Sequence, residues 1–153
     1  MTTIKILLVG ENNMLQAELF SLLMSDDAVI HYYNGIKFIN RKYRSIKCQI
    51  WDGYVRRKIL PSLIADMDII LVIFDPSHES EFDHMIKQVN GIVHDEQNKG
   101  EVILVSHNSL KPVVSEEEII EFAELLNVTY YHLPQLSVDS IQKLFNSILS
   151  FQG

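Results

Sequence analysis

Uninterrupted runs of apolar residues mark the buried strands of this chain. Each run is bounded by polar or turn-forming residues, which is typical of strands that are covered on both faces in a parallel sheet. The runs predict strands at Ile4–Val9, within 68–75 and at 102–105, and a further strand is expected at 128–133, before a proline.

Helical spacing of apolar side chains separates these strands. The expected helices span 14–24, 61–67, 81–93, 116–126 and 137–151. Ser115 and Glu118 have the spacing of a capping box, in which a hydroxyl and a carboxylate satisfy the first free amides of a helix. The helix at 116–126 therefore has a defined start.

Two strand-like segments, 29–40 and 45–51, flank Arg41-Lys42-Tyr43-Arg44 and predict an antiparallel hairpin. The resulting order, β-α-β-β-α-β-α-β-α-β-α, predicts an α/β fold in three layers. We expect a mixed, mostly parallel six-stranded sheet with one antiparallel hairpin and with helices on both faces. A length of 153 residues suits a single domain spanning residues 1–153.

The composition is that of a globular protein with a full core, at 47% hydrophobic and 22% charged residues. No apolar run reaches the roughly 18 residues of a membrane span, so we expect no membrane insertion. The single cysteine, Cys48, excludes a disulfide within the chain and favours a reducing compartment. We therefore expect a cytoplasmic location.

The first strand is followed by a segment at the position of a phosphate-binding loop, but the residues that bind phosphate and Mg²⁺ in such a loop are replaced. Such a loop reads G-x-x-x-x-G-K-[ST] after a buried strand. Gly10 opens the segment, but Leu15 stands at the second glycine, Gln16 at the lysine and Ala17 at the hydroxyl residue. Gln16 has no charge to set against a phosphate, and Ala17 has no oxygen to offer Mg²⁺.

The order of elements, with a hairpin after the first helix, resembles that of the Ras superfamily of small GTPases. The local amino-acid sequence is most similar to that of its Rab branch. Residues 49–52 resemble the strand that ends in W-D-T-A-G. Residues 68–75, followed by Phe82, resemble A-D-G-I-I-L-V-Y-D…S-F, and 114–126 resemble the helix after the base-recognition loop. The resemblance covers nearly the whole chain and implies a small-GTPase-like P-loop fold.

Followed motif by motif, the resemblance implies that the nucleotide chemistry is lost. The Mg²⁺-binding threonine falls on Tyr33. In the D-x-x-G motif Asp52 persists, but Val55 replaces the glycine whose N–H meets the terminal phosphate, and Arg56 replaces the water-orienting glutamine. No aspartate stands in 105–110, where the guanine-reading motif falls.

These losses predict a pseudo-GTPase. Hydrogen bonds to charged groups contribute about 1.5–3 kcal/mol each, so losing the lysine, the metal hydroxyl and the base aspartate removes roughly 5–9 kcal/mol. That is on the order of 10⁴–10⁶ in affinity. We expect no guanine nucleotide, no other cofactor and no catalysis, with Leu15, Tyr33 and Val55 filling the empty site. The chain would then act as a scaffold or adaptor.

Two alternatives remain open. One is a divergent GTPase that still binds nucleotide weakly through backbone contacts. The other is a receiver-like pseudo-signalling domain, in which Asp75 would mimic the phosphorylated aspartate and Ser106 the hydroxyl residue. Receivers run strictly β-α-β, so the presence or absence of the hairpin decides this point.

Charge is unevenly distributed along the chain. The net charge is −7, yet eight basic residues and only one acid lie between Lys37 and Lys58. The resemblance places this segment on the effector-facing side, where Phe38 and Trp51 keep two aromatic effector positions and Leu63 takes the third. The alternative is a solvated hairpin edge, which lysine and arginine protect from aggregation.

We expect an exposed Phe–Trp–Leu patch, surrounded by basic side chains, to bind a protein partner that has an acidic surface. The expected interface comprises Phe38, Arg41, Lys42, Arg44, Trp51, Arg56, Arg57 and Leu63. The acidic remainder of the chain and the lack of a recognition helix argue against nucleic acid as the target.

No metal site is expected from the sequence. Asp52 and Asp75 each end a strand, where structural roles suffice, and His78, His84 and His94 show no ligand spacing.

Overall fold

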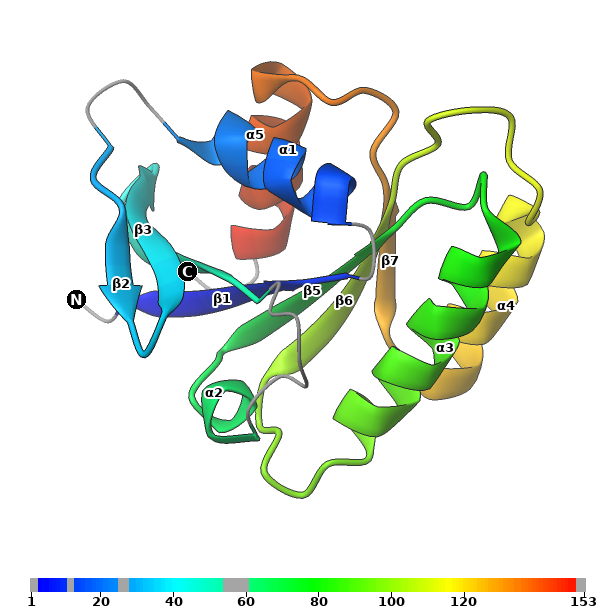
Figure 1. Ribbon diagram of the computed structural model, residues 1–153, viewed down its shortest axis with the longest axis horizontal. Helices are drawn as coiled ribbons and strands as arrows, with labels where there is room; N and C mark the ends of the chain where they lie inside the picture. The colour runs from blue at the N-terminus through cyan, green and yellow to red at the C-terminus, as the bar shows by residue number, and fades with distance from the viewer. Residues whose placement is uncertain (1–2, 11–12, 25–27, 54–60, 151–153) are drawn as a thin grey trace.

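The computed structural model describes residues 3–10, 13–24, 28–53 and 61–150 (Figure 1). Its strands are β1 (Ile4–Val9), β2 (His31–Tyr33), β3 (Ile36–Tyr43), β4 (Ile46–Asp52), β5 (Ile69–Phe74), β6 (Glu101–Ser106) and β7 (Thr129–His132). Its helices are α1 (Asn13–Leu23), α2 (Pro61–Ala65), α3 (Glu79–Val93), α4 (Glu116–Leu126) and α5 (Val138–Leu149).

These strands form one mixed sheet in the order β2-β3-β4-β1-β5-β6-β7. β1 pairs in parallel with β4 and with β5, and the parallel part continues through β6 to β7. β3 pairs antiparallel with β2 on one side and with β4 on the other. The mostly parallel α/β sheet is confirmed, and the antiparallel hairpin rules out the receiver-like alternative.

Helices cover both faces of the sheet, as the buried central strands require. α1 and α5 lie together on one face, while α2, α3 and α4 lie on the other (Figure 1). All six residues of β5 are buried. The two faces have separate apolar cores, with Phe20 and Phe145 in one and Phe74 and Phe82 in the other.

The described sheet has seven strands instead of the expected six, because the segment 29–40 turns back on itself. Asn34 and Gly35 both have positive φ, 53° and 79°, so β2 and β3 form a tight hairpin in which Tyr33 pairs with Ile36. An Asn-Gly pair between strand-like residues is the strongest local signal of such a turn. The sequence contained this signal, and the prediction of one long strand was wrong.

The second hairpin turn also differs from its expected position. β3 continues to Tyr43 and pairs with Ile46, so the turn is Arg44-Ser45, with Arg44 at a φ of 59°. Arg41 and Lys42 therefore lie within the strand. Alternation of side chains along a strand then sends these two basic residues to opposite faces of the sheet.

The predicted start of α4 is confirmed. Ser115 Oγ accepts a hydrogen bond from Glu118 N at 3.2 Å. α3 begins at Glu79, two residues before its expected start, and α2 ends at Ala65, short of the expected 67. In the described part of the chain, no helix combines the length and the apolar character that crossing a bilayer requires.

Candidate functional site

Gln16, at the position of the phosphate-binding lysine, is bonded into the interior of the protein. It lies near the start of α1 and has no exposed surface. Its Nε2 donates to the carbonyl oxygen of Leu8 at 3.1 Å and to Oδ1 of Asp52 at 2.5 Å. The side chain that would meet a phosphate in a P-loop thus joins the ends of β1 and β4.

Asp52 has a basic partner as well. Lys37 Nζ lies 3.5 Å from Asp52 Oδ2, and the same ammonium lies 4.9 Å from the centre of the Phe20 ring. In P-loop proteins the aspartate that ends this strand helps to hold Mg²⁺. Here an ammonium group and an amide supply the positive electrostatic environment of Asp52.

Gly10 is explained by packing and does not require a phosphate. A Cβ atom at this position would lie 2.7 Å from the carbonyl oxygen of Ile73, so the ends of β1 and β5 approach too closely for any side chain. Leu15 is buried in the core beside Leu19 and Phe20. Ala17 is exposed.

Tyr33 does not fill the nucleotide position, and that part of the expectation was wrong. Its side chain is 63% exposed and meets the Trp51 ring edge-on, with ring centres 6.3 Å apart. The cause is the β2–β3 turn, since pairing with Ile36 places Tyr33 in a sheet and on the outer surface. Val55, Arg56 and Arg57 lie outside the described residues.

The loop after β6 is hydrogen-bonded to the end of β5 through Asp75. Ser77 N donates to Asp75 Oδ1 at 2.9 Å, and Ser109 donates to the carboxylate through both its amide and its hydroxyl. Burial raises the pKa of Asp75, but the hydrogen bonds from Ser109 and Ser77 outweigh that effect and hold the pKa below its usual value. Next to Ser109, Leu110 is 68% exposed in the guanine-reading segment.

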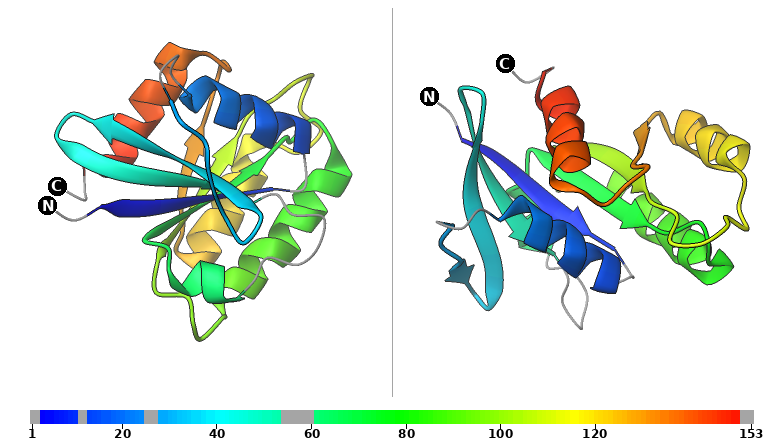
Figure 2. Two further views of the ribbon diagram at one scale, coloured as in Figure 1. Left: turned by 60° about the vertical axis from the view of Figure 1, so that its left-hand side comes forward. Right: turned by 90° about the horizontal axis from the view of Figure 1, so that it is seen from above.

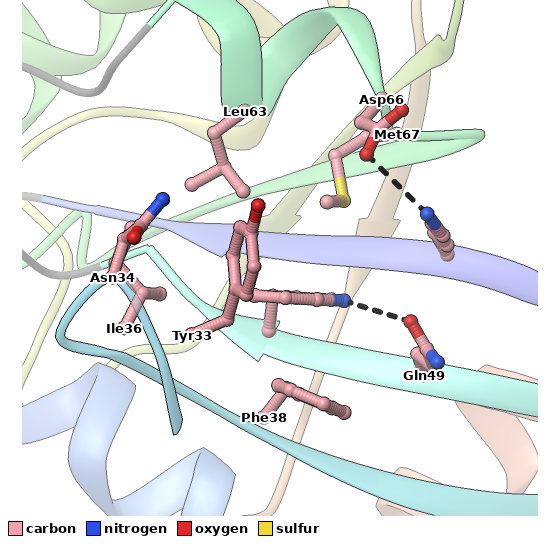
Figure 3. Close-up of a pocket in the computed structure, with 10 residues that line it drawn as sticks. Tyr33, Asn34, Ile36, Phe38, Gln49, Leu63, Asp66 and Met67 are labelled. Atoms are coloured by element: carbon pink, nitrogen blue, oxygen red, sulfur yellow. Dashed lines mark hydrogen bonds and ion pairs between the residues drawn. The ribbon is translucent and has the colours of Figure 1, made fainter. Parts of the chain in front are cut away.

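A groove of about 400 Å³ lies between the hairpin strands and α2 (Figure 3). Its apolar lining includes Tyr33, Ile36, Phe38, Trp51, Leu63 and Met67. Phe38 and Trp51 stack at a centroid distance of 4.2 Å, and Trp51 Nε1 donates to Gln49 Oε1 at 3.3 Å. An ion pair of 3.3 Å between Lys5 and Asp66 closes one side of the groove.

The structure brings Phe38, Trp51 and Leu63 together as expected, but not as an exposed patch. Trp51 is only 7% exposed and forms part of the groove wall, while Phe38 and Leu63 are partly buried. Among the aromatic side chains that line the groove, the exposed one is Tyr33, which the sequence did not assign to the surface. Its edge contact with Trp51 follows from the hairpin turn that was missed.

The basic residues of the hairpin do not surround the groove evenly. The guanidinium of Arg41 lies 5.6 Å from the ring of Tyr43, which is buried in the core on the α1–α5 face. Arg44 is exposed in the turn. Lys42 shares the face of Phe38, but strand alternation turns Arg41 to the opposite face, so the expectation that Arg41 lies beside Phe38 and Trp51 was wrong.

Lys42 and Lys47 face one another directly across β3 and β4. Both lysines are exposed, and like charges in directly opposite positions destabilise an antiparallel pair. Lys47 shares the face of Gln49 and Trp51 through the same alternation. The groove therefore has a patch of positive charge near one end, and no acid among the described residues forms an ion pair with either lysine.

Comparison with known protein families agrees with these features. A sequence model of the Ras family matches residues 5–151 of this chain. The match includes Gln16, Asp52 and the hairpin strands.

Proposed function

Since the chain belongs to the Ras family, we propose that it is a pseudo-GTPase, a small-GTPase-like domain that binds a protein partner without guanine nucleotide. Within the family we place it nearest the Rab branch, because the sequences of residues 49–52 and 68–75 resemble those of Rab proteins. A cytoplasmic location agrees with the single, buried, free thiol of Cys48.

The observation that supports this proposal most strongly is the bonding of Gln16. Phosphoryl chemistry in this family needs a lysine ammonium near the β- and γ-phosphates. The uncharged amide of Gln16 is instead engaged inside the protein, where it donates to Leu8 and to Asp52. Releasing it toward a phosphate would break both hydrogen bonds without a gain in charge pairing.

The environment of Asp52 supports the same conclusion. Its ion pair with Lys37 places a positive charge where the family requires a divalent cation. Mg²⁺ and the Lys37 ammonium would repel one another, so metal binding at Asp52 must first displace the lysine. Ala17 offers no hydroxyl to offset that cost.

Isothermal titration with GTP, GDP and ATP in the presence of Mg²⁺ tests the loss of nucleotide binding. We expect no binding heat at micromolar protein and no nucleotide released when the purified protein is denatured. A Ras-family GTPase that binds nucleotide serves as the positive control. Nucleotide found in stoichiometric amount after denaturation would contradict the proposal.

The groove between the hairpin and α2 is the proposed partner site. Aromatic side chains in a partly enclosed pocket provide the contacts that dominate measured protein–protein affinities. The Lys42–Lys47 pair suits an acidic side chain of the partner, since an inserted carboxylate would relieve the repulsion between the two ammonium groups.

Partner binding is tested with two tyrosines of β2 that differ in direction. Tyr33 lines the groove, whereas Tyr32 belongs to the other face of the strand and is similarly exposed, at 69%. A partner captured from the native host should bind Tyr33→Ala at least tenfold more weakly and Tyr32→Ala unchanged. Trp51→Ala should weaken binding by about 2 kcal/mol or more.

Charge reversal at Lys42 and Lys47 should mainly slow association, because exposed charges steer the encounter more than they hold the complex. Lys87→Glu with Lys111→Glu is the matched control, because these exposed lysines lie on α3 and in the loop after β6, away from the hairpin. If binding survives Tyr33→Ala, Trp51→Ala and the Lys42→Glu/Lys47→Glu pair, the functional surface lies elsewhere.

One further candidate function has specific support. Gly10 and Asp52 keep their family positions, and the Ras-family match spans the whole nucleotide-binding frame. A divergent GTPase would use backbone amides in place of the missing lysine. The titration described above separates it from the pseudo-GTPase by a measurable binding heat.

A further inference from the structure

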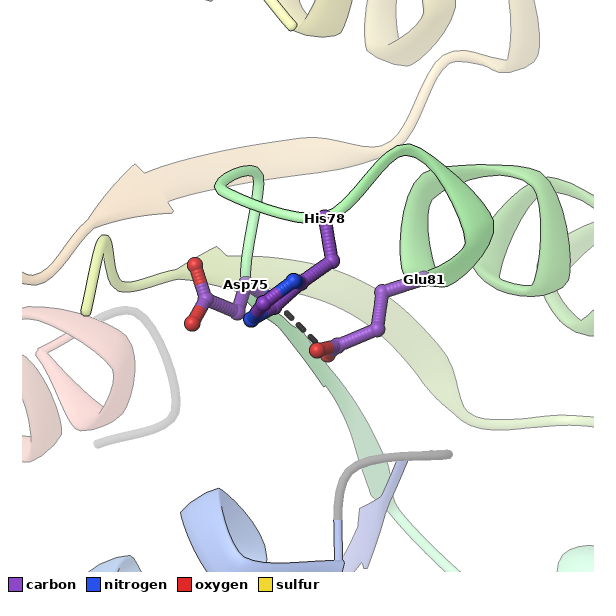
Figure 4. A group of neighbouring side chains, drawn as sticks. All are labelled: Asp75, His78 and Glu81. Carbon is purple, nitrogen blue, oxygen red and sulfur yellow. Dashed lines mark hydrogen bonds between the residues drawn. The ribbon is translucent and has the colours of Figure 1, made fainter. Parts of the chain in front are cut away.

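We propose that the carboxyl end of β5 binds one Zn²⁺ ion through Asp75, His78 and Glu81. Asp75 directly follows the strand, His78 is the N-cap residue of α3, and Glu81 lies in the first turn of that helix (Figure 4). This site is separate from the nucleotide position around Gln16 and from the aromatic groove.

The three side chains lie close together although they are spaced along the chain. One ligand atom from each lies within 4.8 Å of the other two. Donor atoms around tetrahedral Zn²⁺, bound at about 2.0–2.2 Å, lie roughly 3.3 Å apart. A contraction of about 1.5 Å would therefore complete the site. His78 is exposed and Glu81 is half-buried, so both have room for such a change.

Asp75 is a buried negative charge that lacks a positive partner. It is 2% exposed, and both of its oxygens accept hydrogen bonds from neutral donors of Ser77 and Ser109, which is the pattern of an ionised carboxylate. No described lysine or arginine forms an ion pair with it. Buried charges are as a rule paired or bound to metal ions.

One of the hydrogen bonds to the Asp75 carboxylate is weak enough for a metal ion to replace it. Its donors are Ser77 N, Ser109 N and Ser109 Oγ, with the Ser109 amide shared between the two oxygens. An ionised carboxylate has about four acceptor sites, so a metal ion would take the site now used by the long, shared contact of the Ser109 amide, at 3.3 and 3.4 Å. The same hydrogen bonds fix its orientation, as partners of metal-bound carboxylates commonly do.

Glu81 and His78 are suitably placed for the remaining two positions. Glu81 Oε1 accepts from the backbone amide of Asp75 at 3.1 Å, which holds its carboxylate beside the strand end. His78 has extended backbone angles, and its imidazole does not cap the helix. Within the described ranges no side chain or backbone group is hydrogen-bonded to that ring, so a ring nitrogen is available for the metal.

The donor set selects the class of metal. One imidazole nitrogen and two carboxylate oxygens suit Zn²⁺, with a water molecule as the fourth ligand. Mg²⁺ and Ca²⁺ prefer oxygen ligands and larger coordination numbers. In the sequence, the three residues are separated by steps of three, from Asp75 to His78 and from His78 to Glu81. Because these steps run from a strand end into a helix, they do not match the usual spacings of metal ligands.

The test is a titration of chelator-treated protein with Zn²⁺, followed by calorimetry, and with Co²⁺, followed by its visible absorption. We expect one ion per chain. His78→Ala and Glu81→Gln should each weaken binding at least tenfold. The matched controls are His84→Ala and Asp83→Asn, which alter exposed residues of the same helix and should change the affinity less than twofold.

Histidine side-chain NMR provides a second, independent measurement. Zn²⁺ should shift the ring signals of His78 and leave those of His84 and His94 in place. Absence of binding, binding that His78→Ala leaves intact, or equal losses in the ligand and control variants would each overturn the proposal. A loss in only one of the two ligand variants would overturn the three-ligand assignment.

Discussion

At the scale of single residues, the carboxylate of Asp75 shows how hydrogen bonds can outweigh burial. Burial alone favours the protonated form, whereas the hydroxyl and amide donors of Ser109 and the amide of Ser77 favour the ionised form. Because the pKa is lower in the folded protein than in the unfolded chain, ionisation of Asp75 stabilises the fold. That contribution is fully present above the unfolded pKa, near about 3.9.

Ser109→Ala should therefore destabilise the protein by about 1.5 kcal/mol at pH 7, because a hydrogen bond to a charged group is lost. The difference from wild type should shrink as the pH falls below about 4. Urea unfolding in EDTA at pH 7 and pH 3 measures both values. Ser80→Ala, on the exposed side of α3, is the control, and a deficit that does not depend on pH would contradict this account.

The thiol of Cys48 should be inert in the folded protein. Burial raises its pKa to about 11, and the side chain is enclosed between the sheet and the α1–α5 layer. At pH 8 the thiolate fraction is then about 0.1%, and the thiolate is the reactive form. Ellman's reagent should give no signal in native buffer and one equivalent in urea. Rapid reaction of the folded protein would show that β4 opens.

At the scale of elements, the β2–β3 hairpin depends on its two-residue turn. Gly35 has a φ of +79°, and a Cβ atom added there would meet no atom within 4 Å beyond its chain neighbours, so only backbone strain opposes a side chain. Gly35→Ala should cost about 1–2 kcal/mol. Gly91→Ala is the matched control, since Gly91 is equally uncrowded but helical and the change should stabilise by about 0.5–1 kcal/mol.

Urea midpoints of the two variants provide the measurement. Opposite signs are expected, although both changes add one methyl group to open space. If Gly35→Ala were neutral, the residue would not hold a left-handed conformation in solution, and the position of Tyr33 beside Trp51 would need another explanation.

Most elements of the fold were predictable because their signals are local. The unbroken apolar run of β5 and the capping pair Ser115 and Glu118 each determine structure within a few residues. The six-strand count failed at Asn34-Gly35, where a turn signal was outweighed by the strand-like residues on both sides. A short turn changes the direction of the chain without changing its composition, so periodicity alone does not detect it.

The residue types at the candidate site can be read from the sequence, but their contacts cannot. That Gln16 and Ala17 lack phosphate chemistry is visible in the sequence. That Gln16 bonds to Asp52 depends on the ends of β1 and β4 lying side by side, which only the tertiary structure establishes. Likewise, Arg41 was expected in the turn, but β3 continues to Tyr43, so Arg41 lies within the strand on the face opposite Phe38.

At the scale of the whole molecule, charge separates toward opposite ends. The basic residues Lys42, Arg44 and Lys47 lie on the hairpin strands and their turn, while the exposed acids of α4 lie at the far end of the sheet, and the right-hand view in Figure 2 shows these two elements on opposite sides. Those acids are Glu116, Glu117, Glu118, Glu121 and Glu124. A charge distribution of this kind orients the molecule as it approaches a charged partner.

The folded state should be stable without any ligand. Lys37 and Gln16 already surround Asp52, and Leu15 is packed in the core, so no bound nucleotide is needed to hold these groups together. Thermal unfolding in EDTA should be a single cooperative transition, and adding GTP with Mg²⁺ should leave its midpoint unchanged. A broad transition that nucleotide sharpens and raises would contradict this expectation, because ligands that bind only the folded state stabilise it.

The pairing of Tyr33 with Ile36 has a consequence for timing. A segment that is held in place by a terminal phosphate is released when that phosphate is hydrolysed, so the rate of hydrolysis sets how long the segment stays ordered. β2 is held instead by its neighbour β3 in a backbone ladder that persists as long as the sheet does. The groove wall that Tyr33 provides would then persist without any hydrolysis step to end it. The fraction of the protein bound to a partner would depend on the concentrations of the two proteins and not on the time since the complex formed.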